Sequence, residues 1–227
     1  MTMVFRRRRR DDDTAEPSTG GSGDTEWLDQ HPDEPPARPQ RPDGPFDVSE
    51  VEPAAETRVD LGGLLVRPGP GMQLQLQVDE RSGTGTAVMI VHGDAAVQLV
   101  AVAAPRSSGL WDETKAQIAA DARNRGGTVQ EAPGPFGTEL RLVLPAKTPE
   151  GKNAARPSRV CGVDGPRWLL RATFLGTAVT DAQAFARLVK VVRDTVVVRG
   201  DGPMAPGDVI ALKPPRSPAA GPAPAGG

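Results

Sequence analysis

Two arginines that flank a tryptophan are the residues best suited to binding chemistry in this sequence. They lie in the stretch GVDGPRWLLRATFLG, residues 162–176. Arg167 and Arg171 are four residues apart, so on an extended strand both point to one face while Trp168 points to the other. A guanidinium binds carboxylate or phosphate groups through paired N–H donors. The spacing therefore predicts a site for an anionic ligand or partner at Arg167, Arg171 and Trp168.

A plainer interpretation of these arginines stays open. Charged residues on one face of a sheet often pair with acids on a neighbouring strand, and such exposed ion pairs contribute little. Glu139 lies in a predicted strand and is a candidate acid opposite the two arginines. In that case Arg167 and Arg171 only cover a solvated face.

Residue combinations that support catalysis are scarce. The two histidines are His31 and His92, and neither has a catalytic partner nearby in the sequence. Cys161 lies between Val160 and Gly162, which is typical of a buried thiol without reactivity. No GxSxG, Walker-type or HExxH motif occurs, nor GxGxxG after a strand. We predict no catalytic residue, no metal and no cofactor, and favour a protein that is not an enzyme.

Two segments could hold a phosphate, but only weakly. The glycine-rich stretch GDGPMAPGD, residues 200–208, opens no helix. Arg106 precedes a helix expected to start near Ser107–Trp111, whose N-terminus would attract an anion. An ordinary capped helix accounts for the second pattern equally well.

Composition narrows the class of protein. The chain has 227 residues with 26 Gly and 24 Pro, well above the usual share of roughly 12% for the two together. The net charge is −2, aromatic residues make up 4%, and Tyr is absent. A nucleic-acid interface with stacked aromatic side chains is therefore not supported. A single Cys excludes an internal disulfide framework.

The ends of the chain differ from its middle. Residues 1–56 form an acidic, Pro-rich arm that starts with five arginines, and residues 214–227 form a Pro/Ala/Gly tail; we expect both to be disordered. Residues 57–213 are expected to form one domain. Trp27 and Leu28 stand out in the acidic arm as a candidate docking motif for a protein partner. No apolar segment follows the arginines, and no stretch is long enough to span a membrane, so we expect a cytoplasmic protein.

The hydrophobic pattern of the middle predicts an α+β fold. One helix is expected to begin near Trp111 and end before Gly126. A second should begin at a capping box of Thr180 and Gln183, with an apolar stripe that includes Phe185 and Leu188. Short turns join the strands, which indicates an antiparallel sheet of about seven to nine strands packed with two main helices. The strands are expected in one short apolar run at residues 58–66 and at residues 72–78, 86–92, 95–103, 128–131, 139–144, 159–162, 167–175 and 196–198.

Two strings carry a resemblance to a known family. GPRWLLRATFLG, followed by a helix and then VVVRGDGPMAPGDVIALKPP, is similar to a family of uncharacterised actinobacterial proteins, DUF3710, over about residues 50–213. No activity is established for that family, so the resemblance implies a protein of unknown function. Its members tend to be encoded near a deoxyuridine triphosphatase and an OB-fold protein, which suggests nucleotide handling as the alternative to a binding or adaptor domain. The order of elements also resembles the Mog1/PsbP-type sandwich of non-enzymatic adaptors.

Overall fold

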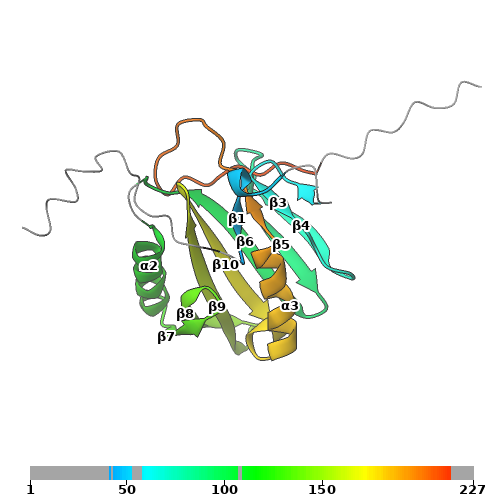
Figure 1. Cartoon of the computed structure of the whole chain (residues 1–227). Helices are drawn as coiled ribbons and strands as arrows, with labels where there is room; N and C mark the ends of the chain where they lie inside the picture. The colour runs from blue at the N-terminus through cyan, green and yellow to red at the C-terminus, as the bar shows by residue number, and fades with distance from the viewer. Residues whose placement is uncertain (1–40, 42, 53–57, 107–108, 216–227) are drawn as a thin grey trace, which may run out of the picture. The chain divides into compact units, whose positions relative to one another are not determined.

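A seven-stranded antiparallel sheet forms the centre of the molecule (Figure 1). The computed structural model describes residue 41 and residues 43–52, 58–106 and 109–215. Across the sheet the strands follow the order β4 (Gln73–Val78), β5 (Gly85–His92), β6 (Ala95–Ala103), β10 (Trp168–Gly176), β9 (Asn153–Gly165), β8 (Gly137–Lys147) and β7 (Thr128–Gly134). β4 and β7 are therefore its two edges.

A second, small sheet joins distant parts of the chain. Its order is β1 (Phe46–Asp47), β11 (Val196–Val197), β3 (Leu64–Val66) and β2 (Val59–Asp60). β1 and β11 run parallel, with Phe46 beside Val196. Because β11 follows α3 (Ala182–Arg193) almost directly, this pairing ties the start of the described chain to the segment after the last helix.

The two α-helices pack on opposite faces of the large sheet. α3 (Ala182–Arg193) buries Leu188 and Val192 in a core that includes Leu170 and Phe174. α2 (Trp111–Asn124) buries Trp111 in a smaller core with Leu169. Successive residues of a strand point to opposite faces of the sheet. Leu169 therefore points into the core beneath α2, and Leu170 points into the core beneath α3. Figure 1 shows α3 in front of the sheet and α2 beside its left-hand part.

This architecture confirms the predicted fold class, an antiparallel sheet with two main helices. The likeness to the Mog1/PsbP-type sandwich stays a prediction. The apolar stripe of α3 is also confirmed, because Leu188, Val189 and Val192 are buried and Phe185 packs against the same core. The helix begins one residue later than its predicted cap: the Asp181 carboxylate, rather than Thr180, accepts hydrogen bonds from the N–H groups of Gln183 and Ala184.

Ordered structure begins before the predicted domain boundary at residue 57. Residues 43–52 contain β1 and a 3-10 turn, η1 (Val48–Glu50), within the stretch predicted to be a disordered arm. The composition is indeed polar there, but Asp47 and Glu50 form a capping box, and β1 finds a partner in β11. The arginine run at the start of the chain, Trp27, Leu28 and residues 216–227 lie outside the described residues.

Candidate functional site

Arg171 lies in the middle of the sheet, on the face that carries α2. Its cross-strand neighbours are Val100 on β6 and Gly162 on β9. The side chain is half-buried, and its Nε is inaccessible to solvent and has no hydrogen-bond partner among the residues that the structure describes. Burial lowers the pKa of the Arg171 guanidinium below its ordinary value. A desolvated cation of this kind is stabilised by an anion and costs free energy without one.

The surroundings of Arg171 explain why no described acid reaches it. Trp111 packs on Gly162, where an added Cβ would meet the indole at 2.1 Å, so an aromatic ring occupies one side. Asp164 shares this face of the sheet, diagonal to Arg171. Its carboxylate instead accepts hydrogen bonds from the N–H groups of Leu110 at 2.7 Å and Trp111 at 3.2 Å. The nearest acid by strand register is thus committed to the N-terminus of α2.

Asp164 also caps the N-terminus of α2. The N-cap position is Leu110, whose side chain cannot accept a hydrogen bond. Asp164 supplies the acceptor from β9, more than fifty residues away in the sequence. The N-terminus of this helix is therefore already occupied by a carboxylate of the chain itself, and that carboxylate is not available to pair with Arg171.

Arg167 is not on the strand face predicted for it. β10 begins at Trp168, and Pro166 and Arg167 form the two-residue turn between β9 and β10. Arg167 has a φ of 64°, the only positive φ of a described residue other than glycine. Proline fixes φ near −65° at the first turn position and leaves Arg167 at the second, where a type II turn requires positive φ. The four-residue spacing therefore does not place Arg167 and Arg171 on one face.

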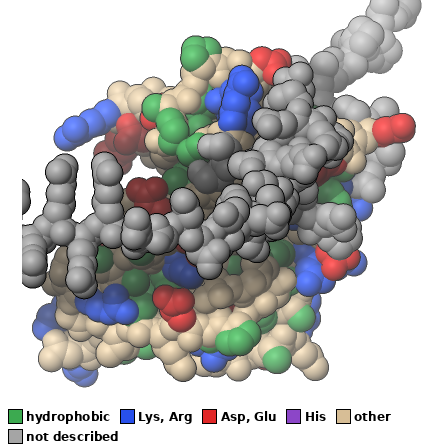
Figure 2. Space-filling view, turned by 60° about the vertical axis from the view of Figure 1, so that its left-hand side comes forward, with side chains coloured by type: hydrophobic (Ala, Val, Ile, Leu, Met, Phe, Trp, Pro, Cys, Tyr) green, Lys and Arg blue, Asp and Glu red, His purple; other side chains and the backbone are tan. Residues whose placement is uncertain are grey.

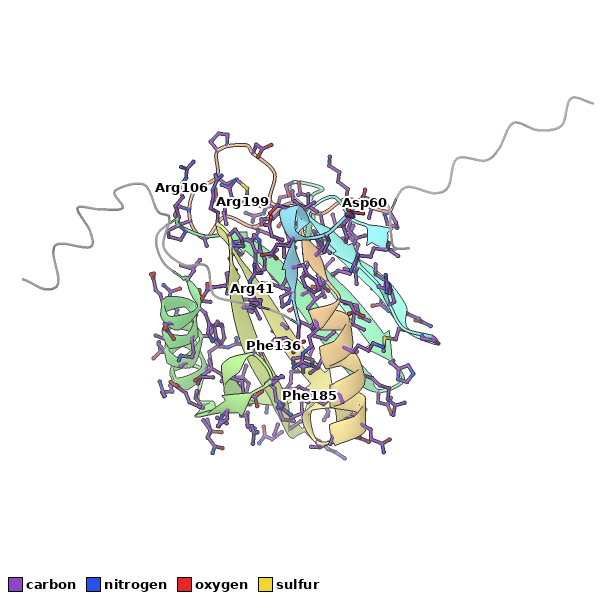
Figure 3. The ribbon with its side chains drawn as sticks, in the orientation of Figure 1. Arg41, Asp60, Arg106, Phe136, Phe185 and Arg199 are labelled. Carbon is purple, nitrogen blue, oxygen red and sulfur yellow. The ribbon has the colours of Figure 1, made fainter. Side chains whose placement is uncertain are left out.

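The turn instead brings Arg167 to one end of the sheet with two other segments. The Arg167 carbonyl accepts a hydrogen bond from the N–H of Ala104, directly before Pro105 and Arg106 begin the link to α2. The glycine-rich loop 200–208 returns to the same place, where Gly207 N–H donates to the Ala103 carbonyl. Figure 3 labels Arg106 and Arg199 at this end of the molecule. Three segments that sequence analysis treated separately therefore meet here.

The arginines at this end have few acidic partners. Arg106 is exposed and Arg167 half-buried, and neither forms an ion pair with a described residue. Arg199 donates to the carbonyls of Gly200 and Gly202, so it holds the loop closed. Figure 2 shows Lys and Arg side chains interspersed with Asp and Glu over the visible face, so the protein has no single basic surface there. Sequence analysis missed Arg199, because nothing in its spacing marks the loop it supports.

Trp168 has no surface to offer a ligand. It is fully buried on the α3 face, and its indole N–H donates to the Asp47 carboxylate. The guanidinium of Arg41 lies 4.8 Å from the ring centroid. Its orientation away from Arg171 was predicted, but its surroundings make it a packing residue.

Glu139 also lies on the α3 face, so it does not pair with Arg171. It is fully buried and accepts two hydrogen bonds from Arg159, at 3.0 and 2.9 Å, and one from Arg141 at 3.0 Å. The Arg159 guanidinium lies 3.5 Å from the centroid of the Phe185 ring. Glu139 therefore does form an ion pair, but its partners are Arg159 and Arg141 rather than Arg167 and Arg171. Through Arg159 and Phe185 this ion pair joins the sheet to α3.

The candidates for catalysis stay apart. Cys161 is buried, and burial together with nearby Glu139 raises the pKa of its thiol to about 12. His92 ends β5, near Gly71 and far along the sheet from Cys161. Among the residues that the structure describes, no cluster of His, Cys, Asp and Glu could hold a metal ion. Nor does any helix among them have the length and apolar character needed to cross a membrane.

Comparisons with known proteins identify the family of this chain. A family model described as "Protein of unknown function (DUF3710)" matches residues 44–221. The chain therefore belongs to that family, and the match starts at β1, inside the stretch that composition alone assigned to the arm. A search of curated proteins found no match.

Proposed function

We propose that this protein is a non-catalytic binding domain whose α2-side sheet face takes an anionic group of a partner at Arg171. The observation that carries the proposal is the half-buried Arg171, whose Nε reaches neither solvent nor a hydrogen-bond partner among the described residues and whose pKa is lowered by burial. A buried cation of this kind is not expected to stabilise the folded protein, because replacing a buried charge by an apolar group is often neutral or stabilising. The position of Arg171 is explained if a bound anion supplies the missing partner of its guanidinium.

The form of the surface favours a macromolecular partner over a small substrate. Arg171 lies on a sheet face beside buried Val100 and half-buried Thr173 and Gln98, none of which is charged. Catalysis needs acid–base or nucleophilic groups within hydrogen-bond reach of one another. The face supplies one fixed charge and neutral donors, which suits recognition of a carboxylate in an acidic protein segment.

The rest of the predicted context belongs to the same proposal. A cytoplasmic location and a contribution of Trp27 and Leu28 to partner binding are both part of it. The competing function is nucleotide handling, for which Arg106 and Arg167 at the end of the sheet would be the phosphate contacts. That candidate is favoured only by the absence of ion pairs at these two arginines among the described residues.

The test uses the full chain and Arg171→Gln, with Arg81→Gln as the matched control. Arg81 is exposed in the turn after β4, away from the proposed site. Thermal unfolding is measured with poly-L-glutamate, with inorganic phosphate and with nucleoside triphosphates. We expect poly-L-glutamate to stabilise the wild type and the control but not Arg171→Gln. A ligand at 100 times its Kd adds about 2.7 kcal/mol, which such a measurement resolves.

Cellular function provides the second readout. Arg171→Gln should fold, as circular dichroism would show, and should fail to complement a deletion strain that Arg81→Gln restores. Full complementation by folded Arg171→Gln would overturn the proposal. Stabilisation by nucleotides that depends on Arg106 and Arg167, and not on Arg171, would establish the competing function instead.

A further inference from the structure

The two edges of the large sheet differ sharply in how they are protected. β7 carries Pro133, which cannot donate a backbone hydrogen bond, and the charged Glu131. Lys115 of α2 forms an ion pair with Glu131 at 3.4 Å, so the helix also holds this edge. Proline, charge and a covering helix are the usual devices that prevent an edge strand from pairing with another chain.

β4 has none of these devices. Its sequence, QLQLQV, contains no charged residue and no proline over Gln73–Val78. Among the described strands its only partner is β5. In Figure 1, β4 forms the right-hand border of the sheet. Alternate residues of an antiparallel edge strand direct their N–H and C=O groups outward, so β4 presents unused backbone donors and acceptors.

The side chains of β4 match a second copy of the same strand. Gln73, Gln75 and Gln77 point to one face, while Leu74 and Leu76 pack partly exposed against the α3-side core. A twofold axis normal to the sheet keeps each face on its own side. Antiparallel pairing about that axis then places Leu opposite Leu over the core and Gln opposite Gln on the other face.

The regular part of β4 sets the register of such a pair. The pairing with β5 is irregular between Gln77 and Val78, and Gly71 has a φ of 73° before the strand. This leaves Gln73–Gln77 as regular strand, with Gln75 at its centre. The axis therefore passes at Gln75, so that Gln75 faces its own copy and Leu74 faces Leu76.

We propose that the protein forms a symmetric homodimer in which β4 pairs antiparallel with β4 of a second copy, giving one continuous sheet of fourteen strands. The absence of charge on β4 makes a like-with-like contact favourable, whereas a charged edge would repel its own copy. The pairing would also cover Leu74 and Leu76. This inference is independent of the site at Arg171, which lies in the middle of the sheet.

The first test is the oligomeric state of the full chain by analytical ultracentrifugation over a range of concentrations. We expect the wild type to sediment at twice its 23.8 kDa at high concentration and to dissociate on dilution. Gln75→Lys places two like charges opposite each other and should yield monomer throughout. Gln130→Lys makes the same change at an exposed position of β7, the protected edge, and should leave the dimer intact.

The second test reads the register directly and does not depend on Gln75→Lys folding. Cα atoms of opposite residues lie about 4.5–5.5 Å apart, within the range of a disulfide. Gln75→Cys should therefore form a disulfide-linked dimer under mild oxidation. In the same register two copies of Gln73→Cys lie four residues apart along the strands, about 13 Å, and should stay unlinked. The native Cys161 is present in both variants but is buried, so we expect it to form no disulfide between copies.

Three results would overturn the proposal. They are a wild type that is monomeric at every concentration, a dimer that survives Gln75→Lys as fully as Gln130→Lys, and linkage of Gln73→Cys without linkage of Gln75→Cys. The second result would place the interface elsewhere, and the third would exclude this register.

Discussion

The indole N–H of Trp168 donates a hydrogen bond of 2.8 Å to the carboxylate of Asp47, 121 residues earlier in the chain. Both side chains are buried, and Asp47 also caps η1 by accepting from the N–H and hydroxyl of Ser49. One carboxylate therefore fixes the first described segment to the central strand β10. Asp47 lies in β1, which pairs with β11, so this contact also links the small sheet to the large one.

We predict that Trp168→Phe destabilises the protein by about 1–3 kcal/mol. The substitution keeps most of the ring but leaves a buried carboxylate without its indole donor, and an unsatisfied buried group costs about that much. Urea unfolding followed by circular dichroism measures the change. An unfolding free energy equal to that of the wild type would show that the hydrogen bond contributes nothing.

The same contact makes stability depend on pH. Burial alone raises the pKa of Asp47, but hydrogen bonds from Ser49 and Trp168 and the charge of Arg41 outweigh it, so the pKa lies below 3.8. Since the folded pKa is depressed, this stabilisation is present in full well above the ordinary pKa of 3.8, begins to fall as the pH approaches that value, and is lost as the pH drops through the folded pKa. Asp47→Asn should therefore flatten the loss of stability below about pH 4. The exposed Asp201→Asn is the control and should keep the wild-type profile.

Glu139 and Arg159 offer a test of the buried ion pair beneath α3. Glu139→Ala should cost about 3–5 kcal/mol, because it leaves the Arg159 guanidinium unpaired beside Phe185. The double variant Glu139→Leu with Arg159→Met should recover most of that loss, since it removes both charges. Chemical unfolding of Glu139→Leu, of Arg159→Met and of the double variant measures the coupling between the two residues. Losses that simply add would show that the two residues act independently.

The apolar stripe of α3 should be strongly stabilising. Leu188 is fully buried in the main core, so Leu188→Ala should cost about 2–5 kcal/mol. Lys190→Ala, at an exposed position of the same helix, controls for helix propensity and should change the unfolding free energy by less than about 0.5 kcal/mol. Equal effects of the two substitutions would contradict the assignment of the core face.

Local pattern was sufficient to predict the regular elements. The alternation of Gln and Leu in Gln73–Val78 and the stripe of Leu188, Val189 and Val192 each have one period and one buried face, so both elements were correct. The Cys161 thiol was likewise expected to be buried, since it lies inside an apolar strand.

Contacts between distant residues could not be predicted in this way. Asp47 looked like one acid of a polar arm, and only Trp168 and β11 give it a place in the fold. Asp164 directly precedes Gly165 at the end of β9, and nothing in the local sequence marks it as the residue that caps α2. Arg167 was assigned to a strand from its spacing, whereas Pro166 before it already favoured a turn. Of the two arginines expected at the candidate site, only Arg171 therefore lies on the sheet face.

The positive φ of Arg167 allows a prediction that separates a structural role of its side chain from a binding role. A residue with a Cβ pays about 1–2 kcal/mol in the left-handed region, whereas glycine does not. Glycine loses more chain entropy on folding, about 0.5–1 kcal/mol. Arg167→Gly should therefore leave the unfolding free energy unchanged or raise it by up to about 1 kcal/mol. Arg167→Ala keeps the strain and should be the less stable of the two.

The pair of variants separates a structural role of Arg167 from a binding role. If the arginine only fills the turn, Arg167→Gly should complement a deletion strain as well as the wild type does, or better. If its guanidinium contacts an anionic partner at the end of the sheet, both variants should lose function to the same degree, although Arg167→Gly is the more stable protein. Loss of function that followed stability instead, with Arg167→Ala impaired and Arg167→Gly normal, would assign the residue to the turn alone. A strained arginine where glycine fits better is expected only if the side chain does something that glycine cannot.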